Sequence, residues 1–224
     1  RSSQNLDILL AVHDAFQECL DNNISVTIIE GNHDKVDQEA ARGYCHVFDS
    51  FDNVRVIDTW GEVGFGDLAM GLISYFPENG SFIQKHDELM GYFDGTDYQK
   101  RILYIHQGIR GALSQPTDDE LPADMFYKWD KVLVGHYHNR CKFDNIEYIG
   151  SSRQHNFGED EEKGYTILFS DGDTEFVQNK VNIRYKTLEL SFDEINSHIK
   201  ETIEDLTQDG YRVRVKILCD PEQV

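Results

Sequence analysis

Three short apolar segments, each ending in glycine and in histidine or asparagine, constrain the fold of this chain more than any other feature. They are VTIIEGNHD, ILYIHQG and VLVGHYH, which begin at residues 26, 102 and 132. Short apolar runs bounded by turn-forming residues are typical of buried strands. Ligands commonly bind outside the carboxyl ends of such strands in α/β sheets. We therefore predict a sheet with polar side chains gathered along one edge.

The rest of the pattern predicts a mixed α/β (α+β) core of packed sheets. Helical periodicity occupies two early segments, from Ser2 or Ser3 to Leu20 and from Lys35 to Phe48. Residues 77–99 predict a loop around one short helix near residues 83–93 (IQKHDELMGYF). Other apolar or alternating segments predict further strands at residues 53–58, 66–76, 141–151 and 163–171.

The character of the chain changes at about residue 186, where a strand, a helix and a second strand follow one another. Ser191 and Glu194 form a capping-box pattern at the start of the helix, and Gly210 is placed to end it. This piece is too small to enclose a core of its own. We therefore predict a first domain at residues 1–185 and the beginning of a second domain at residues 186–224.

The composition is globular but strongly acidic. Of 224 residues, 39% are hydrophobic, and the formal net charge is −20. This charge argues against non-specific binding of a polyanion, because phosphate contacts need Lys and Arg. It does not exclude an enzyme that meets a phosphodiester through bound divalent cations, since those cations reverse the local sign.

Two further features concern the compartment. The four cysteines are scattered without a CxxC pair, which predicts reduced thiols. No apolar stretch approaches the length of a membrane span, and no secretory signal pattern opens the chain. These features predict a cytoplasmic protein without a membrane partner.

The side chains at the three strand ends are of metal-ligand types. Neutral imidazole suits Mn, Zn and Fe, and the side-chain oxygen of Asn32 suits Mn or Mg. His136 and His138 stand two residues apart, so an extended segment places both rings on one side. With His106, this mixed set of nitrogen and oxygen donors fits a two-metal site that cleaves phosphoesters. Taken singly, each piece also fits a plainer structure, such as a turn at residues 31–34 or a hydrogen-bonded histidine at position 106.

The remaining histidines lack this context. His13, His46 and His198 fall in predicted helices and His86 in the predicted loop, so these four are interpreted as surface or structural residues. For His155, which follows the GSS turn, the role stays open.

Together the motifs resemble the calcineurin-like metallophosphoesterase superfamily. Residues 31–34 (GNHD), the isolated His106 and residues 135–138 (GHYH) look like the third, fourth and fifth motifs of that superfamily. Residues 148–168 (YIGSSRQHNFGEDEEKGYTIL) resemble a segment of SbcD-type recombination nucleases. The resemblance covers about residues 1–185. It implies packed β-sheets flanked by helices, followed by the start of a small β-α-β capping domain.

The first two motifs of the superfamily, Asp-x-His and Gly-Asp-x-x-Asp, do not occur where the family pattern requires them. By the resemblance they should precede Arg1. The Gly-Asp pair at residues 66–67 lies after the third motif, so it is rejected as a substitute. The missing motifs supply a bridging carboxylate and most ligands of one metal. The 224 residues alone are therefore expected to be catalytically incomplete, whereas the intact protein is expected to be an enzyme.

The resemblance implies a role for each matching residue. Two divalent cations are expected, Mn²⁺ first and Mg²⁺ as the alternative. The implied ligands are Asn32, His106 and His136 for one cation and His138 for the other. His33 is expected to protonate the departing 3′ oxygen, and Asp34 is expected to orient the His33 ring.

The resemblance also implies partners. DNA is the expected substrate, an SbcC-type ATPase the expected protein partner, and residues 4–20 the candidate surface of a homodimer. The setting is a bacterial cytoplasm, or the host cytoplasm for a phage-encoded protein. The candidate contacts to DNA phosphates follow closely on site motifs and are Arg110, Arg140 and Arg153. Ordinary ion pairing with the acidic excess is an equal alternative for these arginines.

The leading hypothesis is a Mn-dependent DNA exonuclease and endonuclease subunit that acts in DNA recombination and repair. A general metallophosphoesterase acting on nucleotides, cyclic nucleotides or phosphoproteins is the closest alternative, and the acidic charge favours it. A catalytically inactive scaffold of the same fold is the alternative from another class. The intact Asn32 and His33, together with the histidines at the strand ends, argue against such a scaffold.

Overall fold

The computed structural model describes residues 5–115, 117, 119–195 and 197–219. Within this part the chain divides into two compact units. The first takes in the described residues of Arg1–Tyr137, Cys141–Ile149 and Leu168–Asp173, and the second those of His138–Arg140, Gly150–Ile167 and Thr174–Val224. The boundary predicted at residues 185 and 186 does not coincide with this division. Glu161, for example, bonds to Lys186 Nζ and to Tyr211 OH across that boundary.

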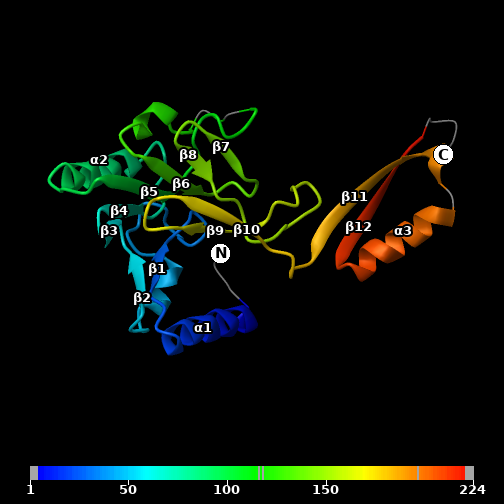
Figure 1. The fold of residues 1–224 in the computed structure, drawn as a ribbon, viewed down its shortest axis with the longest axis horizontal. Helices are drawn as coiled ribbons and strands as arrows, with labels where there is room; N and C mark the ends of the chain where they lie inside the picture. Colours follow the sequence, from blue (N-terminus) through cyan, green and yellow to red (C-terminus); the bar gives the residue numbers. More distant parts are fainter. Residues whose placement is uncertain (1–4, 116, 118, 196, 220–224) are drawn as a thin grey trace. The chain divides into compact units, whose positions relative to one another are not determined.

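A six-stranded mixed sheet forms the body of the first unit (Figure 1). Its strands in spatial order are β3 (Trp60–Phe65), β4 (Leu68–Ile73), β5 (Lys100–His106), β6 (Lys131–Gly135), β8 (Ile146–Tyr148) and β7 (Cys141–Phe143). Strands β4, β5, β6 and β8 run parallel, and the two outer strands are antiparallel to their neighbours. Parallel strands are covered on both faces, which explains the apolar runs in the sequence.

Strand β3 is one that the sequence pattern does not predict. Its segment, WGEVGF, has glycine at two of six positions, which lowers its strand propensity. The strand forms because it pairs with β4 along its whole length, from Trp60 opposite Ile73 to Phe65 opposite Leu68.

Helix α2 (Phe82–Phe93) lies against one face of this sheet (Figure 1). Its buried side chains belong to Phe82, His86, Leu89, Met90 and Phe93. The short helix predicted near residues 83–93 is therefore confirmed, and the interpretation that His86 lies in a loop is wrong. His86 accepts a 3.0 Å hydrogen bond from Trp129 Nε1, and Trp129 follows the 3₁₀ helix η2 (Ala123–Phe126). His86 is thus a structural residue of the core.

Helix α1 (Leu6–Asp21) opens the described chain and ends where the Asp-Asn-Asn sequence predicts. Its N-cap is Asn5, whose side-chain oxygen accepts a 3.0 Å hydrogen bond from the Asp7 backbone N–H. The predicted caps, Ser2 and Ser3, lie outside the described residues.

A two-stranded parallel sheet, β1 (Val26–Ile29) and β2 (Val54–Ile57), follows α1 in the same unit. Phe16 of α1 packs edge-to-face on Phe48 and Phe51, with ring centroids 5.0 and 6.0 Å away. The strands predicted from residue 26 and at residues 53–58 are confirmed as β1 and β2.

The helix predicted from Lys35 to Phe48 is wrong. Only Tyr44–Phe48 is helical, as the 3₁₀ helix η1. The fully buried carboxylate of Glu30 accepts hydrogen bonds from Gly43 N at 2.7 Å and Cys45 N at 2.8 Å. Hydrogen bonds to a buried charge are stronger than those between neutral groups, so this contact outweighs a weak helical preference that already contained a glycine.

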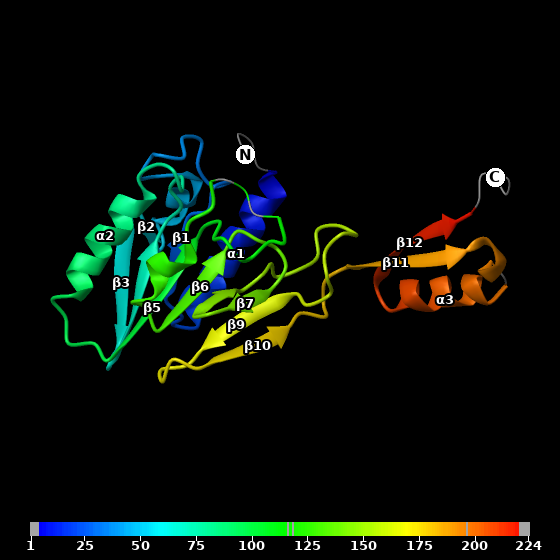
Figure 2. The same ribbon diagram turned by 90° about the horizontal axis from the view of Figure 1, so that it is seen from above.

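The second unit contains a hairpin and a strand-helix-strand segment. The hairpin pairs β9 (Gly164–Leu168), whose last residue belongs to the first unit, with β10 (Thr174–Gln178). Strands β11 (Arg184–Ser191) and β12 (Tyr211–Leu218) pair in parallel, and helix α3 (Ser197–Gln208) lies beside them (Figure 2).

The predicted strand, helix and strand after residue 186 are confirmed, and so are the local signals. Glu194 Oε2 accepts hydrogen bonds from Ser191 N at 2.7 Å and from Ser191 Oγ at 2.8 Å. This pair caps the short 3₁₀ helix η3 (Phe192–Glu194) that precedes α3. Gly210 follows α3 with φ of 85°, a left-handed conformation that glycine adopts without strain.

The predicted fold class is confirmed as a mixed α/β (α+β) arrangement in which a central mixed sheet is flanked by helices. In the described part of the chain, no helix is both long enough and apolar enough to cross a membrane.

Candidate functional site

The carboxyl ends of several strands lie together in the first unit, as predicted. Strand β5 ends at His106 and β6 ends at Gly135, and these two residues are paired across the parallel strands. Strand β1 is followed by Glu30, whose N–H donates to Ser74 Oγ and whose carbonyl accepts from Tyr75 N, just beyond the end of β4. The carboxyl ends of β4, β5 and β6 therefore lie at one edge of the six-stranded sheet, the usual place for a ligand in such sheets. The end of β1, from the two-stranded sheet, is hydrogen-bonded beside the end of β4.

His106 lies at the centre of this edge. Its Nε2 is 3.2 Å from Asn32 Oδ1, and its ring centroid is 5.2 Å from that of His136. A Cβ atom added at Gly31 would come within 2.9 Å of the His106 ring, and one added at Gly135 would come equally close. Glycine in both motifs therefore leaves the space that the ring occupies.

His136 has an unusual backbone conformation. Its φ is 94°, in a region that residues other than glycine rarely adopt. Such a conformation costs on the order of 1–3 kcal/mol and persists at functional sites where the surroundings hold it. The ring of His136 meets that of His106 edge-to-face, at an interplanar angle of 82°.

The turn at residues 31–34 is built by its own polar groups. The Asp34 carboxylate accepts a 2.9 Å hydrogen bond from Gly31 N, and Asp34 N donates to Gly31 O at 3.0 Å. Asn32 is half-buried in this turn, and His33 is exposed. Asp34 thus forms the turn, and its role in orienting the His33 ring stays a prediction.

The burial of Lys35, the residue that follows the turn, was not predicted from the sequence. Lys35 is buried, and its Nζ donates to Tyr75 O at 2.7 Å and lies 3.9 Å from the centroid of the Phe76 ring. Burial lowers the pKa of Lys35, and the nearby Glu30 only partly opposes this effect. Lys35 Nζ also donates to the nearby Ala40 O at 2.9 Å, but Tyr75 is 40 residues away, so a local sequence pattern could not reveal the buried site of this side chain.

Two tyrosines near His106 were also not recognised. Tyr75 packs edge-to-face on His106 at 6.2 Å, and its hydroxyl donates to Glu78 Oε2 at 3.2 Å. The Tyr137 hydroxyl donates to the buried Glu120 at 2.5 Å. Burial, together with Glu78, raises the pKa of Tyr75 to about 12, and burial also raises the pKa of Tyr137. Both phenols therefore remain protonated donors at neutral pH.

The Gly-Asp pair at residues 66–67 belongs to the other edge of the sheet. It forms the turn between β3 and β4, and the adjacent Leu68 pairs with Lys100 at the start of β5. Since His106 is at the far end of β5, rejecting Asp67 as a substitute ligand is consistent with the structure.

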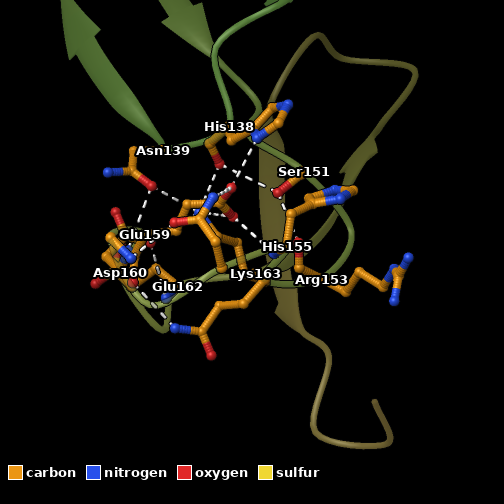
Figure 3. Close-up of polar contacts among 12 residues, drawn as sticks. His138, Asn139, Ser151, Arg153, His155, Glu159, Asp160, Glu162 and Lys163 are labelled. Carbon is orange, nitrogen blue, oxygen red and sulfur yellow. Dashed lines mark hydrogen bonds and ion pairs between the residues drawn. The ribbon is translucent and has the colours of Figure 1, made fainter. Parts of the chain in front are cut away.

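His138 belongs to the second unit, where it contacts side chains and backbone of residues 151–163 (Figure 3). Its Nδ1 is 2.8 Å from Glu159 Oε1, and its ring lies 4.7 Å from that of His155. Burial raises the pKa of the Glu159 carboxyl, but the hydrogen bonds from His138 and from His155 N outweigh it, and the pKa is lowered. Burial and the neighbouring His138 lower the pKa of His155.

The three candidate phosphate-binding arginines fall in both units. Arg110 in the first and Arg153 in the second are exposed. The Arg140 guanidinium lies 3.9 Å above the Phe176 ring and donates to Thr166 Oγ1 at 3.1 Å. Arg140 is thus part of the packing of the β9–β10 hairpin, and contact of any of the three with DNA stays a prediction.

The donors around His106 fit a divalent cation. Two ligand atoms at right angles around an ion are about 3 Å apart when each bond is about 2.1 Å, close to the 3.2 Å between Asn32 Oδ1 and His106 Nε2. Among the described residues, no three His, Cys, Asp or Glu side chains gather closely enough to hold a metal ion. The described cluster therefore offers two imidazoles and an amide oxygen, without a carboxylate.

No protein-family model matches the chain. "Putative phosphoesterase 078R" of Invertebrate iridescent virus 3 is 25% identical over 196 residues, which cover 84% of this chain and 52% of that protein. "Putative phosphoesterase 244L" of Invertebrate iridescent virus 6 is 25% identical over 199 residues, or 86% of this chain and 68% of that protein. "DNA double-strand break repair protein Mre11" of Methanocaldococcus jannaschii is 29% identical over 150 residues, or 62% of this chain and 38% of that protein.

The chain spans about half the length of the first of these relatives. Their names describe two phosphoesterases and a DNA repair protein. The mixed α/β fold and the histidine-bearing edge of its sheet are consistent with the fold of a metallophosphoesterase. These similarities support membership of the metallophosphoesterase superfamily and a function like that of a phosphoesterase or nuclease.

Proposed function

We propose that the protein is a metal-dependent phosphodiesterase of the SbcD type that cleaves DNA. The observation that carries this proposal is the cluster in which His106 is held between Gly31 and Gly135, beside Asn32 and His136. Imidazole and amide donors together suit Mn²⁺, with Mg²⁺ as the alternative. The similarity to a DNA double-strand break repair protein favours DNA among the phosphodiesters.

In this proposal Asn32, His106 and His136 hold one cation, and His138 is a ligand of the other. When bound, two divalent cations lower the pKa of a water molecule and neutralise the charge of the phosphate. The protein itself contributes an acid. His33, exposed on the turn that carries Asn32, donates a proton to the departing 3′ oxygen.

The test is a cleavage assay on linear duplex and single-stranded DNA with Mn²⁺, with Mg²⁺ and with EDTA. It uses the 224 residues and the product of the complete coding sequence side by side, because the described donors around His106 include no carboxylate. Mn²⁺-dependent cleavage is expected for the complete product. His33→Ala should lose turnover and keep Mn²⁺ binding, whereas His136→Ala should lose both. Intact DNA under every condition would refute the nuclease.

A general phosphoesterase is the second candidate. The net charge of −20 opposes DNA binding, and two of the relatives are named only as phosphoesterases. Hydrolysis of a small phosphodiester such as bis(p-nitrophenyl) phosphate, with DNA left intact, would favour this candidate. Mn²⁺ binding without hydrolysis of either substrate would favour an inactive scaffold.

The proposal includes partners in DNA recombination and repair, within the cytoplasm of a bacterium or of a phage host. We propose an SbcC-type ATPase as one partner, which co-purification with the tagged protein would reveal. We also propose a homodimer through α1. Several of its apolar side chains are exposed and support that surface: Leu6, Ile8, Leu9 and Leu10. Sedimentation as a monomer at micromolar concentration would refute the dimer.

A further inference from the structure

His138 is half-exposed, but two side chains that hold it are buried. The side chain of His138 is 52% exposed, whereas those of Glu159 and Lys163 are 8% and 3% exposed. Removing a carboxylate and an ammonium group from water is costly, and their mutual attraction repays that cost only with good geometry and further hydrogen bonds. Here the two charged groups are not in close contact, since Lys163 Nζ is 3.9 Å from Glu159 Oε2. Their closer contacts are to other groups, including His138.

The carboxylate of Glu159 is fixed beside the ring of His138. Oε1 is 2.8 Å from His138 Nδ1 and accepts a 3.0 Å hydrogen bond from Asn156 Nδ2. Oε2 accepts a 3.0 Å hydrogen bond from the His155 backbone N–H. His155 and Asn156 lie in the same short segment as Glu159, so the carboxylate has little freedom to turn away from the ring of His138.

The backbone of His138 is held as well. Its carbonyl accepts hydrogen bonds from Lys163 Nζ at 2.6 Å, from Ser151 N at 3.0 Å and from Ser151 Oγ at 3.3 Å (Figure 3). With the ring of His155 4.7 Å away at an interplanar angle of 30°, the position and the orientation of one half-exposed imidazole are both determined.

An ionised carboxylate can only accept hydrogen bonds. The nitrogen of His138 that faces Glu159 must therefore carry the proton, and in the neutral ring the other nitrogen, Nε2, keeps its lone pair. Histidines that bind metals commonly donate their other ring N–H to a carboxylate, which sets the tautomer and raises the basicity of the ligating nitrogen.

We propose that Glu159 is a positioning residue that holds neutral His138 as the Nδ1–H tautomer and so presents its Nε2 as a ligand for a divalent cation. The tautomer follows from the contacts within the second unit. The role of His138 as a ligand of a divalent cation rests on the proposed function.

The test begins with ¹⁵N-histidine-labelled protein without metal, at a pH of about 8.5, roughly two units above the ordinary histidine pKa. Long-range ¹H–¹⁵N spectra report which ring nitrogen is protonated, and His138→Gln identifies the signal. The wild-type ring should be protonated at Nδ1. In Glu159→Gln both tautomers should appear, because the amide can donate as well as accept.

Glu161→Gln is the matched control. Glu161 lies in the same segment, and its carboxylate accepts hydrogen bonds from Lys186 Nζ at 2.6 Å and Tyr211 OH at 2.9 Å rather than from His138. Like Glu159→Gln, it replaces a hydrogen-bonded carboxylate by an amide, and it should leave the His138 tautomer unchanged. Thermal unfolding followed by circular dichroism compares the stability of the two variants.

Titration with Mn²⁺ then tests the ligand role, since the paramagnetic ion broadens signals of nearby rings. His138 should broaden in the wild type, and Glu159→Gln should weaken binding roughly 10- to 100-fold, while Glu161→Gln should not. A wild-type ring protonated at Nε2 would overturn the positioning role, even if the Glu159 variant did not fold. The expected tautomer without broadening by Mn²⁺ would overturn the ligand role. Neither spectrum requires DNA cleavage, so failure of the proposed nuclease function would be seen separately.

Discussion

Replacing Gly31 by alanine should displace the His106 ring. The added Cβ would lie 2.9 Å from Cε1, 3.0 Å from Nε2 and 3.1 Å from Nδ1, and thus against most of one side of the ring. Non-bonded carbon atoms prefer about 3.5–4.0 Å, so the ring must retreat by about 0.6–1 Å. The 3.2 Å contact between His106 Nε2 and Asn32 Oδ1 then exceeds hydrogen-bond distance.

The magnitude follows from these two effects. Overpacking in a filled site costs about 1–3 kcal/mol, and the lost hydrogen bond costs about 0.5–1.5 kcal/mol. We expect the free energy of unfolding to fall by about 1.5–4.5 kcal/mol. Gly135 also lies against the His106 ring, and a Cβ added there would be 2.9 Å from His106 Nδ1. Gly31→Ala and Gly135→Ala combined should therefore destabilise the protein by more than the sum of the single changes, because each removes the space into which the ring could retreat.

Urea unfolding followed by tryptophan fluorescence measures this effect, because both tryptophans, Trp60 and Trp129, lie in the first unit. Gly91→Ala is the matched control. Gly91 lies within α2, and a Cβ added there meets nothing within 4 Å, so alanine should stabilise the helix by about 0.5–1 kcal/mol. The reasoning is refuted if Gly31→Ala is neutral or behaves like Gly91→Ala. If the cation site is as proposed, Gly31→Ala should also weaken Mn²⁺ binding.

Three other changes test the packing and electrostatics of the first unit. Phe93→Ala removes a fully buried ring and should lower the free energy of unfolding by about 3–5 kcal/mol in the same urea assay; a loss below about 1 kcal/mol would contradict the described core. Glu30→Gln leaves one acceptor oxygen where two backbone N–H groups are bound, so hydrogen exchange at Gly43 and Cys45 should accelerate, and unchanged exchange would argue against the anchor. Burial and neighbouring carboxylates raise the pKa of Cys45 from 9.0 to about 12, so iodoacetamide at a pH of about 8 should alkylate the exposed Cys219 well before Cys45. Equal alkylation rates of Cys45 and Cys219 would contradict this environment. Because the pKa of Cys45 is higher in the folded protein than in the unfolded chain, its protonated thiol favours folding below pH 9.0, and that contribution is lost as pH rises toward 12.

The strands and the edge of the sheet could be predicted because their signals are local. Apolar runs such as those before His106 and His136 reflect burial on both faces of parallel strands, whereas the run before Asn32 forms a strand that is only partly buried. Parallel pairing then brings the carboxyl ends of neighbouring strands together, whatever loops connect them. The strand pattern therefore predicted that the segments carrying Asn32, His106 and His136 would meet, whereas the contacts of His138 with residues 151–163 could not be predicted in this way.

Features that depend on distant partners could not be predicted. The segment from Lys35 to Phe48 has helical periodicity, but the buried Glu30 and the distant Tyr75 O draw its polar groups into other contacts. Strand β3 forms through β4 despite its glycines. Glu159 stands in an acidic run that is typical of a solvated surface, and only the fold shows that its side chain is buried against His138.

The acidic charge of the chain leads to a last prediction about DNA. Several basic side chains near the motifs are engaged within the protein: Lys35 and Lys163 bind backbone carbonyls, and Arg140 packs on Phe176. With a net charge of −20, these contacts leave much of the neutralisation of phosphate to divalent cations. If DNA is the substrate as proposed, we therefore expect DNA binding itself, and not only cleavage, to require Mn²⁺. Fluorescence anisotropy of a labelled oligonucleotide with His33→Ala, in Mn²⁺ and in EDTA at equal ionic strength, measures binding without cleavage. Equal affinity in the two conditions would show that protein side chains alone neutralise the phosphates.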